Sequence, residues 1–164
     1  MKPPQFRRRQ VSGLCTVVLL ACILFGCGSP AASEPESFRG IKWGAEAASV
    51  PGLSQIANEG NLILYEKNGD LLQMGEVKLD QVVYGFYKSR FYMGMIYFPS
   101  AGFSRIEGIL TREIGKPTKQ DNTPSKLIWD GDNVSVLLTL GERSEQGRLV
   151  YLYKPIQLEV ELKK

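Results

Sequence analysis

The first 26 residues divide the chain into a segment that targets the protein and a segment that folds. Three arginines at residues 7–9 precede an apolar run over residues 11–26. A basic stretch followed by an apolar stretch of this length is typical of a secretory signal peptide. A permanent transmembrane helix is the alternative, but it needs about 20 apolar residues and this run is shorter. We therefore expect residues 1–26 to be removed from the mature protein.

The end of the apolar run carries a short motif around a cysteine. Its residues are Leu24, Phe25, Gly26 and Cys27, followed by a small, polar stretch. The motif resembles the lipobox of bacterial lipoproteins, and the alternative is an ordinary buried thiol. The resemblance implies cleavage between Gly26 and Cys27, a diacylglycerol on the Cys27 thiol and acylation of the new amino group. Several acyl chains anchor a protein stably where one is marginal, because each buried methylene contributes ~0.8 kcal/mol.

The residues after Cys27 predict a tether and then one domain. Gly28 follows the cysteine where some lipoproteins have aspartate. By resemblance to lipoprotein sorting in bacteria with two membranes, this favours the periplasmic face of the outer membrane. Residues 27–37 then form the lipidated cysteine and a flexible linker with a reach on the order of 30 Å. Residues 38–164 form a single domain, large enough for one core.

The net charge changes when the predicted signal is removed. The chain has 20 basic and 17 acidic residues, a net charge of +3. The signal takes four basic residues and no acidic residue with it, which leaves a charge of about −1. The positive charge therefore belongs to the signal and gives no support for nucleic acid binding, which requires a basic patch on the folded domain.

The residue types that most often build metal sites are missing from the predicted mature domain. The chain has no histidine, and Cys15 and Cys22 lie in the signal while Cys27 is used for lipid. This removes the commonest general base and metal ligand and predicts no disulfide. Residues 130–133 (DGDN) suit a tight turn better than a calcium loop, whose ligands span twelve residues. We expect no metal and no cofactor.

A set of aromatic and glycine residues marks the start and the middle of the domain. The set is Phe38, Gly40, Ile41, Trp43, Gly44, Tyr84, Phe86, Gly115 and Pro117. It resembles uncharacterised bacterial exported proteins that begin with an F-x-G-I-x-W-G motif and continue with hairpins, an aromatic strand and a helix ending in Gly-x-Pro. The resemblance implies a fold but no activity. We expect Trp43 to seal one end of the sheet rather than to stack on a ligand.

Residue patterns predict an α+β fold, a mostly antiparallel sheet of hairpins with one main helix packed on it. Phe103, Ile106, Leu110 and Ile114 recur at helical spacing, which predicts a helix over about 101–114. Strands are expected at residues 53–58, 61–67, 70–74, 77–87, 91–98, 126–129, 134–140 and 148–153. The alternation over residues 156–163 predicts a last strand at a sheet edge, either blunted or open to a partner strand.

The central hairpin over residues 77–98 is apolar on both faces, which predicts cover on both sides. With an even loop, Gly85 faces Gly94, and the two glycines form a shallow notch. The notch is either an apolar binding groove or, as we favour, the seat of the following helix. An odd loop shifts the register and removes the notch.

Three functions follow from these patterns. The favoured one is a membrane-anchored, non-catalytic binding, assembly or inhibitor module that contacts an envelope protein through an aromatic patch. The second is a carrier of a small apolar ligand in the hairpin groove. The third is a cell-wall hydrolase with paired carboxylates, separated by ~5 or ~6.5–9.5 Å. The patch comprises Tyr84, Gly85, Phe86, Tyr87, Phe91, Tyr92 and Gly94, and the candidate carboxylates are Glu66, Asp70, Asp130 and Asp132.

Overall fold

The computed structural model describes residues 34–120, 126–141 and 145–162. The predicted signal peptide, Cys27 and the first part of the linker lie outside these described residues. Across the described ranges, neither helix has the length and apolar character that crossing a membrane requires.

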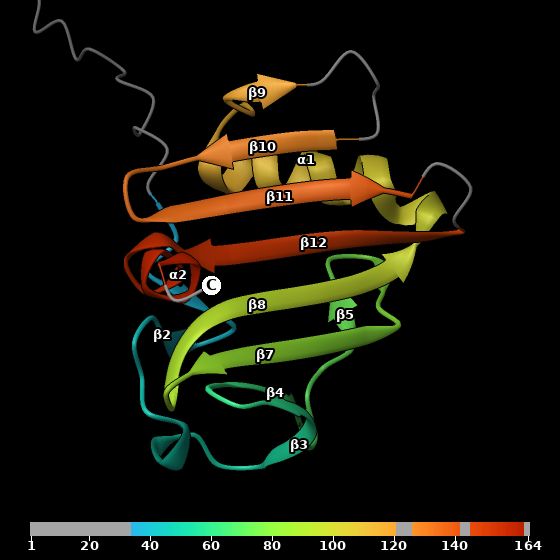
Figure 1. Ribbon diagram of the computed structural model, residues 1–164. Coiled ribbons are helices and arrows are strands. Elements are labelled where there is room, and N and C mark those ends of the chain that lie inside the picture. Colours follow the sequence, from blue (N-terminus) through green and yellow to red (C-terminus); the bar gives the residue numbers. More distant parts are fainter. Residues whose placement is uncertain (1–33, 121–125, 142–144, 163–164) are drawn as a thin grey trace, which may run out of the picture.

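The described chain forms one large antiparallel sheet, two small hairpins and two helices (Figure 1). The large sheet contains β3 (Leu53–Glu59), β4 (Leu62–Lys67), β7 (Gln81–Tyr87), β8 (Arg90–Pro99), β9 (Lys119–Gln120), β10 (Lys126–Asp130), β11 (Val134–Leu140) and β12 (Gln146–Tyr153). Its order is β3-β4-β7-β8-β12-β11-β10-β9. The hairpins pair β1 (Ser37–Phe38) with β2 (Ile41–Lys42) and β5 (Gln73–Met74) with β6 (Val77–Lys78). The helices are α1 (Phe103–Ile114) and α2 (Lys154–Glu161), with single 3₁₀ turns at η1 (Ala47–Ser49) and η2 (Ser100–Gly102). The predicted α+β class is confirmed.

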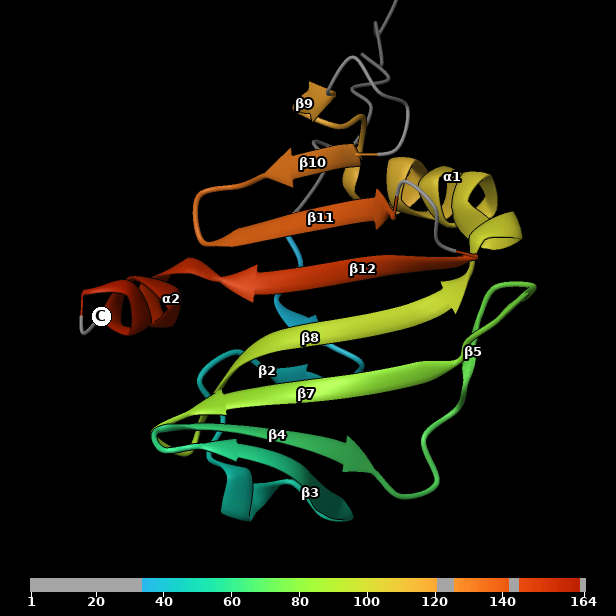
Figure 2. The ribbon, with the colours of Figure 1, turned by 45° about the vertical axis from the view of Figure 1, so that its right-hand side comes forward.

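One side of the large sheet, which we call the covered face, packs against α1 and the β1–β2 hairpin (Figure 2). Phe103, Ile106 and Leu110 of α1 are buried there, as their helical spacing predicts. The helix ends at Gly115, whose φ of +84° favours glycine. This apolar layer buries large side chains completely and supplies most of the core.

The opposite side, the open face, has a helix over one end only, where α2 follows β12 (Figure 2). Side chains alternate between the two faces along each strand. Along β8, Ile96 and Phe98 are buried on the covered face, while Met95 and Tyr97 are half-buried on the open face.

The predicted last strand is wrong, because residues 154–161 form α2. Pro155 lies in the first helical turn, a position that proline favours. Ile156 and Val160, four residues apart, pack on Tyr87 and Tyr92 of the sheet. Alternation of apolar residues fits a strand and also fits a short helix when only every second apolar residue is buried.

The predicted flexible linker is also too long. Residues 34–37 lie against the domain, and Ser37 already belongs to β1. The indole Nε1 of Trp43 donates a hydrogen bond to the Pro35 carbonyl oxygen at 2.7 Å. We call residues 34–38 the strap, since they cross the covered face.

Candidate functional site

The aromatic residues predicted to form a binding patch are buried. Tyr84, Phe86 and Phe91 have no exposed surface. Phe38 of the β1–β2 hairpin covers two of them, with its ring 5.5 Å from that of Tyr84 and 6.2 Å from that of Phe91, while the ring of Tyr65 lies 5.4 Å from that of Phe86. The prediction that these residues present a surface for a partner is therefore wrong for this half of the patch. The sequence analysis did not predict that Phe38 of the N-terminal motif packs over Tyr84 and Phe91.

The other two aromatic residues of the patch lie on the open face beneath α2. Tyr87 is 4% exposed and Tyr92 is 5% exposed, and both contact Ile156. Burial raises the pKa of Tyr92, with a smaller contribution from the charge of Glu59. The helix that sequence analysis assigned to a strand thus covers the remainder of the predicted patch.

A β-bulge changes the register of the central hairpin. The turn consists of Lys88 and Ser89, both at positive φ, so Phe86 pairs with Phe91. Tyr92 is then an extra residue of β8, which shifts the pairing by one. Because of this shift, Phe91 faces the covered side while Tyr92 faces the open side.

The predicted notch of two facing glycines does not form. Gly85 pairs with Met93, and Gly94 pairs with Tyr84. A Cβ atom at Gly85 would lie 2.7 Å from the Met93 Cε, and one at Gly94 would lie 2.5 Å from the Phe38 Cδ1. Both glycines therefore allow close packing of other side chains. The apolar-ligand carrier hypothesis loses its proposed groove.

The candidate carboxylate Asp70 belongs to a polar cluster that holds the β1–β2 hairpin in place. Its Oδ1 accepts hydrogen bonds from Arg39 Nη2 at 2.9 Å and Nε at 3.2 Å. Its Oδ2 accepts a hydrogen bond from the Tyr84 hydroxyl at 2.5 Å. Burial, reinforced by this bond to Asp70, raises the pKa of Tyr84. This arrangement is structural, because both carboxylate oxygens are engaged.

The other three candidate carboxylates, Glu66, Asp130 and Asp132, either have partners of their own or are exposed. Glu66 accepts a hydrogen bond from Gln81 Nε2 at 2.7 Å and shares with Asp70 a hollow of about 270 Å³. Asp130 pairs with Lys154 Nζ at 2.6 Å, and this hydrogen bond lowers the pKa of Asp130. Asp132 is exposed. In the described part of the chain, no cluster of three acidic, histidine or cysteine residues could hold a metal ion.

The strap is fixed by a glutamate that sequence analysis did not single out. Glu34 Oε1 accepts hydrogen bonds from the backbone N–H groups of Asn133 and Val134, both at 2.6 Å. Burial acts to raise the pKa of Glu34, but these bonds and the charge of Lys154 outweigh it and lower the pKa. A single glutamate in a small, polar segment gives no sequence signal for this contact.

Two broad hollows flank the strap on the covered face. One, of about 480 Å³, is lined by Trp129 and Val136, and the other, of about 490 Å³, by Ile96 and Tyr151. Glu34 and Pro35 border both hollows. Burial raises the pKa of Tyr151, with a smaller contribution from Glu113. The strap thus divides one depression between α1 and the sheet into two shallow parts.

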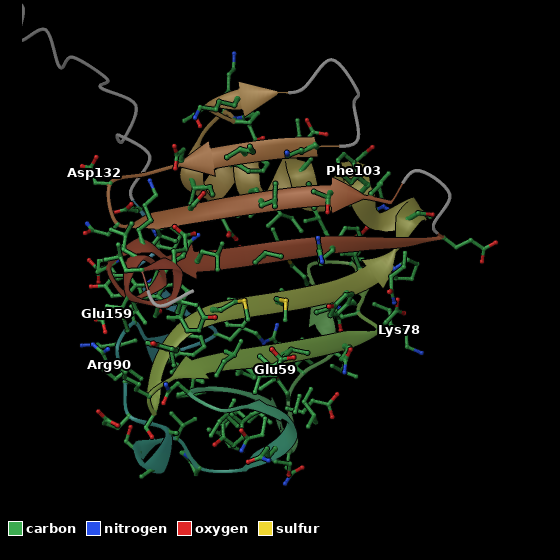
Figure 3. All side chains as sticks on the ribbon, viewed as in Figure 1. Glu59, Lys78, Arg90, Phe103, Asp132 and Glu159 are labelled. Carbon is green, nitrogen blue, oxygen red and sulfur yellow. The ribbon has the colours of Figure 1, made fainter. Side chains whose placement is uncertain are left out.

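The open face carries a continuous apolar row across five strands. The row consists of Val83, Met95, Val150, Leu137 and Ile128, each paired with the next across neighbouring strands. Figure 3 views the sheet from this face, with α1 behind it, and labels Arg90 and Glu159 at the end that α2 covers. Val83 and Val150 are buried, whereas Met95, Leu137 and Ile128 are half-buried, so these three residues bring the apolar surface of the row to solvent. No other described element lies over the centre of this row (Figures 1 and 2).

Two cations border the apolar row. Lys126 of β10 and Arg148 of β12 both pair with Thr139 of β11, which lies between them. All three line a hollow of about 430 Å³ with Tyr97. Neither cation has an acidic partner among residues 34–120, 126–141 and 145–162. An apolar row next to two cations without an acidic partner in the described part of the chain is the arrangement that best suits an external partner.

Comparison with protein-family models, curated proteins and solved structures finds no match for this chain.

Proposed function

We propose that the protein is an envelope lipoprotein, anchored through Cys27, whose domain is a non-catalytic binding module. Its binding surface is the open face, and its partner is a protein with an apolar stripe bordered by acidic side chains. The apolar stripe contacts the half-buried members of the row, Met95, Leu137 and Ile128, and the acidic side chains pair with Lys126 and Arg148. The proposal retains the outer membrane, on its periplasmic face, as the site of action.

The open face is the observation that carries the binding role. Apolar surface in contact with water favours association, and charges at its border increase specificity and the association rate. The buried aromatic patch of the hairpin offers no such surface. The candidate carboxylates either have partners or lie in an exposed turn, so no pair of them favours a hydrolase.

The anchor is tested by the mass of the mature protein isolated from membranes. We expect a chain that begins at Cys27 and carries a diacylglycerol and an N-acyl group. Cys27→Ala should then appear in the soluble fraction. An unmodified thiol, or an intact leader on the membrane-bound protein, would contradict the anchor.

The binding surface is tested by a photo-crosslinking amino acid placed at Leu137 on the open face. A matched control places it at Arg112, which is exposed on α1. In cells that make the protein, we expect an adduct from position 137 and none from position 112. Lys126→Glu with Arg148→Glu should abolish the adduct, whereas an adduct that persists, or one from position 112 alone, would refute this assignment.

A further inference from the structure

We infer that the outer side of α2 is a lipid-binding surface, and that Leu158 and Leu162 enter the interfacial region of the membrane that holds Cys27. The inference rests on the proposed lipid anchor and goes further, because it specifies which end of the domain faces the membrane. The occupant of this surface is a phospholipid bilayer. Three observations lead to it: exposure of the leucines, their position relative to the strap, and the length of chain that precedes Glu34.

Leu158 of α2 and Leu162, which directly follows α2, lie on the side of this helix that faces away from the protein. Leu158 is 58% exposed and Leu162 is 85% exposed. They are four residues apart, which places them on one side of the helix. Ile156, which is 3% exposed, and Val160 occupy the opposite side and pack on the sheet. A helix with one apolar side toward its protein and another toward the outside is suited to lie in a membrane interface.

The charged side chains of α2 form ion pairs or hydrogen bonds beside the exposed leucines. Glu159 pairs with Arg90 at 2.7 Å, and Lys154 pairs with Asp130 at 2.6 Å. Glu161 accepts a hydrogen bond from the Gln157 amide. The charges therefore flank the leucines, as at the edge of an interfacial helix, where polar groups stay among the headgroups.

The start of α2 is joined to the residues that hold the strap. The backbone N–H of Lys154 donates to the Asn133 carbonyl oxygen at 2.8 Å. The N–H of the same Asn133 donates to Glu34 at 2.6 Å. Asn133 thus connects Glu34, the first described residue, to the first turn of α2.

The chain between the anchor and Glu34 is short. Only residues 28–33 separate Cys27 from Glu34. Seven residue steps of at most ~3.6 Å limit the distance between Cys27 and Glu34 to about 25 Å. An acylated Cys27 therefore keeps the Glu34 end of the domain, and α2 with it, close to the lipid surface. A second pair of exposed leucines, Leu71 and Leu72, provides a comparison, because they precede β5 at the opposite end of the sheet (Figures 1 and 2).

The test uses a polarity-sensitive fluorophore on single cysteines. If Cys27 is acylated and the leader is removed, the cysteine in Leu162→Cys is the single free thiol of the mature chain. The lipidated protein is labelled with NBD and reconstituted in vesicles of phosphatidylethanolamine and phosphatidylglycerol. We expect a several-fold rise and a blue shift of the emission relative to the delipidated protein, and quenching by lipids brominated near the headgroup. The matched Leu71→Cys protein should keep the emission of an aqueous label.

The outcomes separate this inference from the anchor on which it rests. Protein that floats with the vesicles but keeps an aqueous emission at position 162 overturns the inference and leaves the anchor intact. Protein that does not float contradicts the anchor, and the inference falls with it. As a second measurement, Leu158→Ser with Leu162→Ser should raise amide exchange of α2 in vesicles several-fold more than Leu71→Ser with Leu72→Ser.

Discussion

The two faces of the large sheet use the same strands for different purposes. On the covered face, Phe91 and Phe98 are completely buried beneath the β1–β2 hairpin and α1. On the open face, Met95 and Leu137 remain half-buried, although the same strands carry them. Burial on the covered face supplies the stability of the domain, while the open face keeps apolar surface that another molecule can remove from water.

The two faces should differ most in how much the free energy of unfolding falls when a large side chain is truncated to alanine. Phe38→Ala on the covered face should lower the free energy of unfolding by ~3–5 kcal/mol, because it leaves a cavity over Gly94 and Phe91. Met95→Ala on the open face should cost about 1 kcal/mol or less. Urea unfolding monitored by tryptophan fluorescence measures both. Equal losses would mean that the faces do not differ in packing.

A smaller effect should follow when the polar support of the covered face is removed. Asp70→Ala leaves the buried Tyr84 hydroxyl without its acceptor and removes two hydrogen bonds of Arg39, which keeps its bond to the Leu71 carbonyl oxygen. The loss should cost about 2–3 kcal/mol. The exposed Asp132→Ala should stay within about 0.5 kcal/mol of the wild type. The same unfolding assay separates the two variants. A harmless Asp70→Ala would show that the hydrogen bonds of Asp70 do not contribute to holding the hairpin.

The contact between the strap and residues 133–134 should weaken at low pH. Because the pKa of Glu34 is lowered in the folded protein, its ionised form stabilises the strap above the ordinary value of 4.5. This contribution should be lost as the pH falls below 4.5 and through the lowered pKa of the folded state. Amide hydrogen exchange of Asn133 and Val134 measures the release.

Two variants of Glu34 separate its charge from its hydrogen bonds. Glu34→Ala should speed exchange of these amides roughly fivefold at neutral pH, the equivalent of ~1 kcal/mol for lost hydrogen bonds. Glu34→Gln should remove the pH dependence while keeping an acceptor oxygen. Persistence of the acid-induced release in Glu34→Gln would assign it to another group.

The smallest effect on stability should come from the open face. Lys126→Glu with Arg148→Glu removes no ion pair within the described part of the chain, so the free energy of unfolding should change by about 0.5 kcal/mol or less. Its effect should appear in partner capture instead. A large loss of stability would indicate that these cations support the fold and would contradict the distinction between the faces.

The sequence predicted the parts of the fold that depend on local pattern. The helical spacing from Phe103 to Ile114 agrees with the structure. The final helix was missed because alternation over residues 156–162 fits a strand when the burial of Leu158 and Leu162 is unknown.

The candidate site was harder to predict because it depends on contacts between distant residues. The bulge at Tyr92 decides which aromatic residues face the core, and no local pattern specifies it. Phe38 covers Gly94 across more than fifty residues of sequence, and Glu34 contacts Asn133 across almost one hundred. The open face became identifiable only when the strand order placed Val83, Met95, Val150, Leu137 and Ile128 in one row.

The most direct test of the open face as the binding surface compares methionine oxidation in intact envelopes and in the purified protein. Met95 lies on the open face, whereas Met74 packs against the covered core. Brief exposure to a mild oxidant followed by mass spectrometry gives the rate of sulfoxide formation at each residue. We predict that Met95 oxidises several-fold more slowly in envelopes than in the purified protein, while Met74 keeps the same rate in both. Equal rates for Met95 in the two preparations would contradict the account.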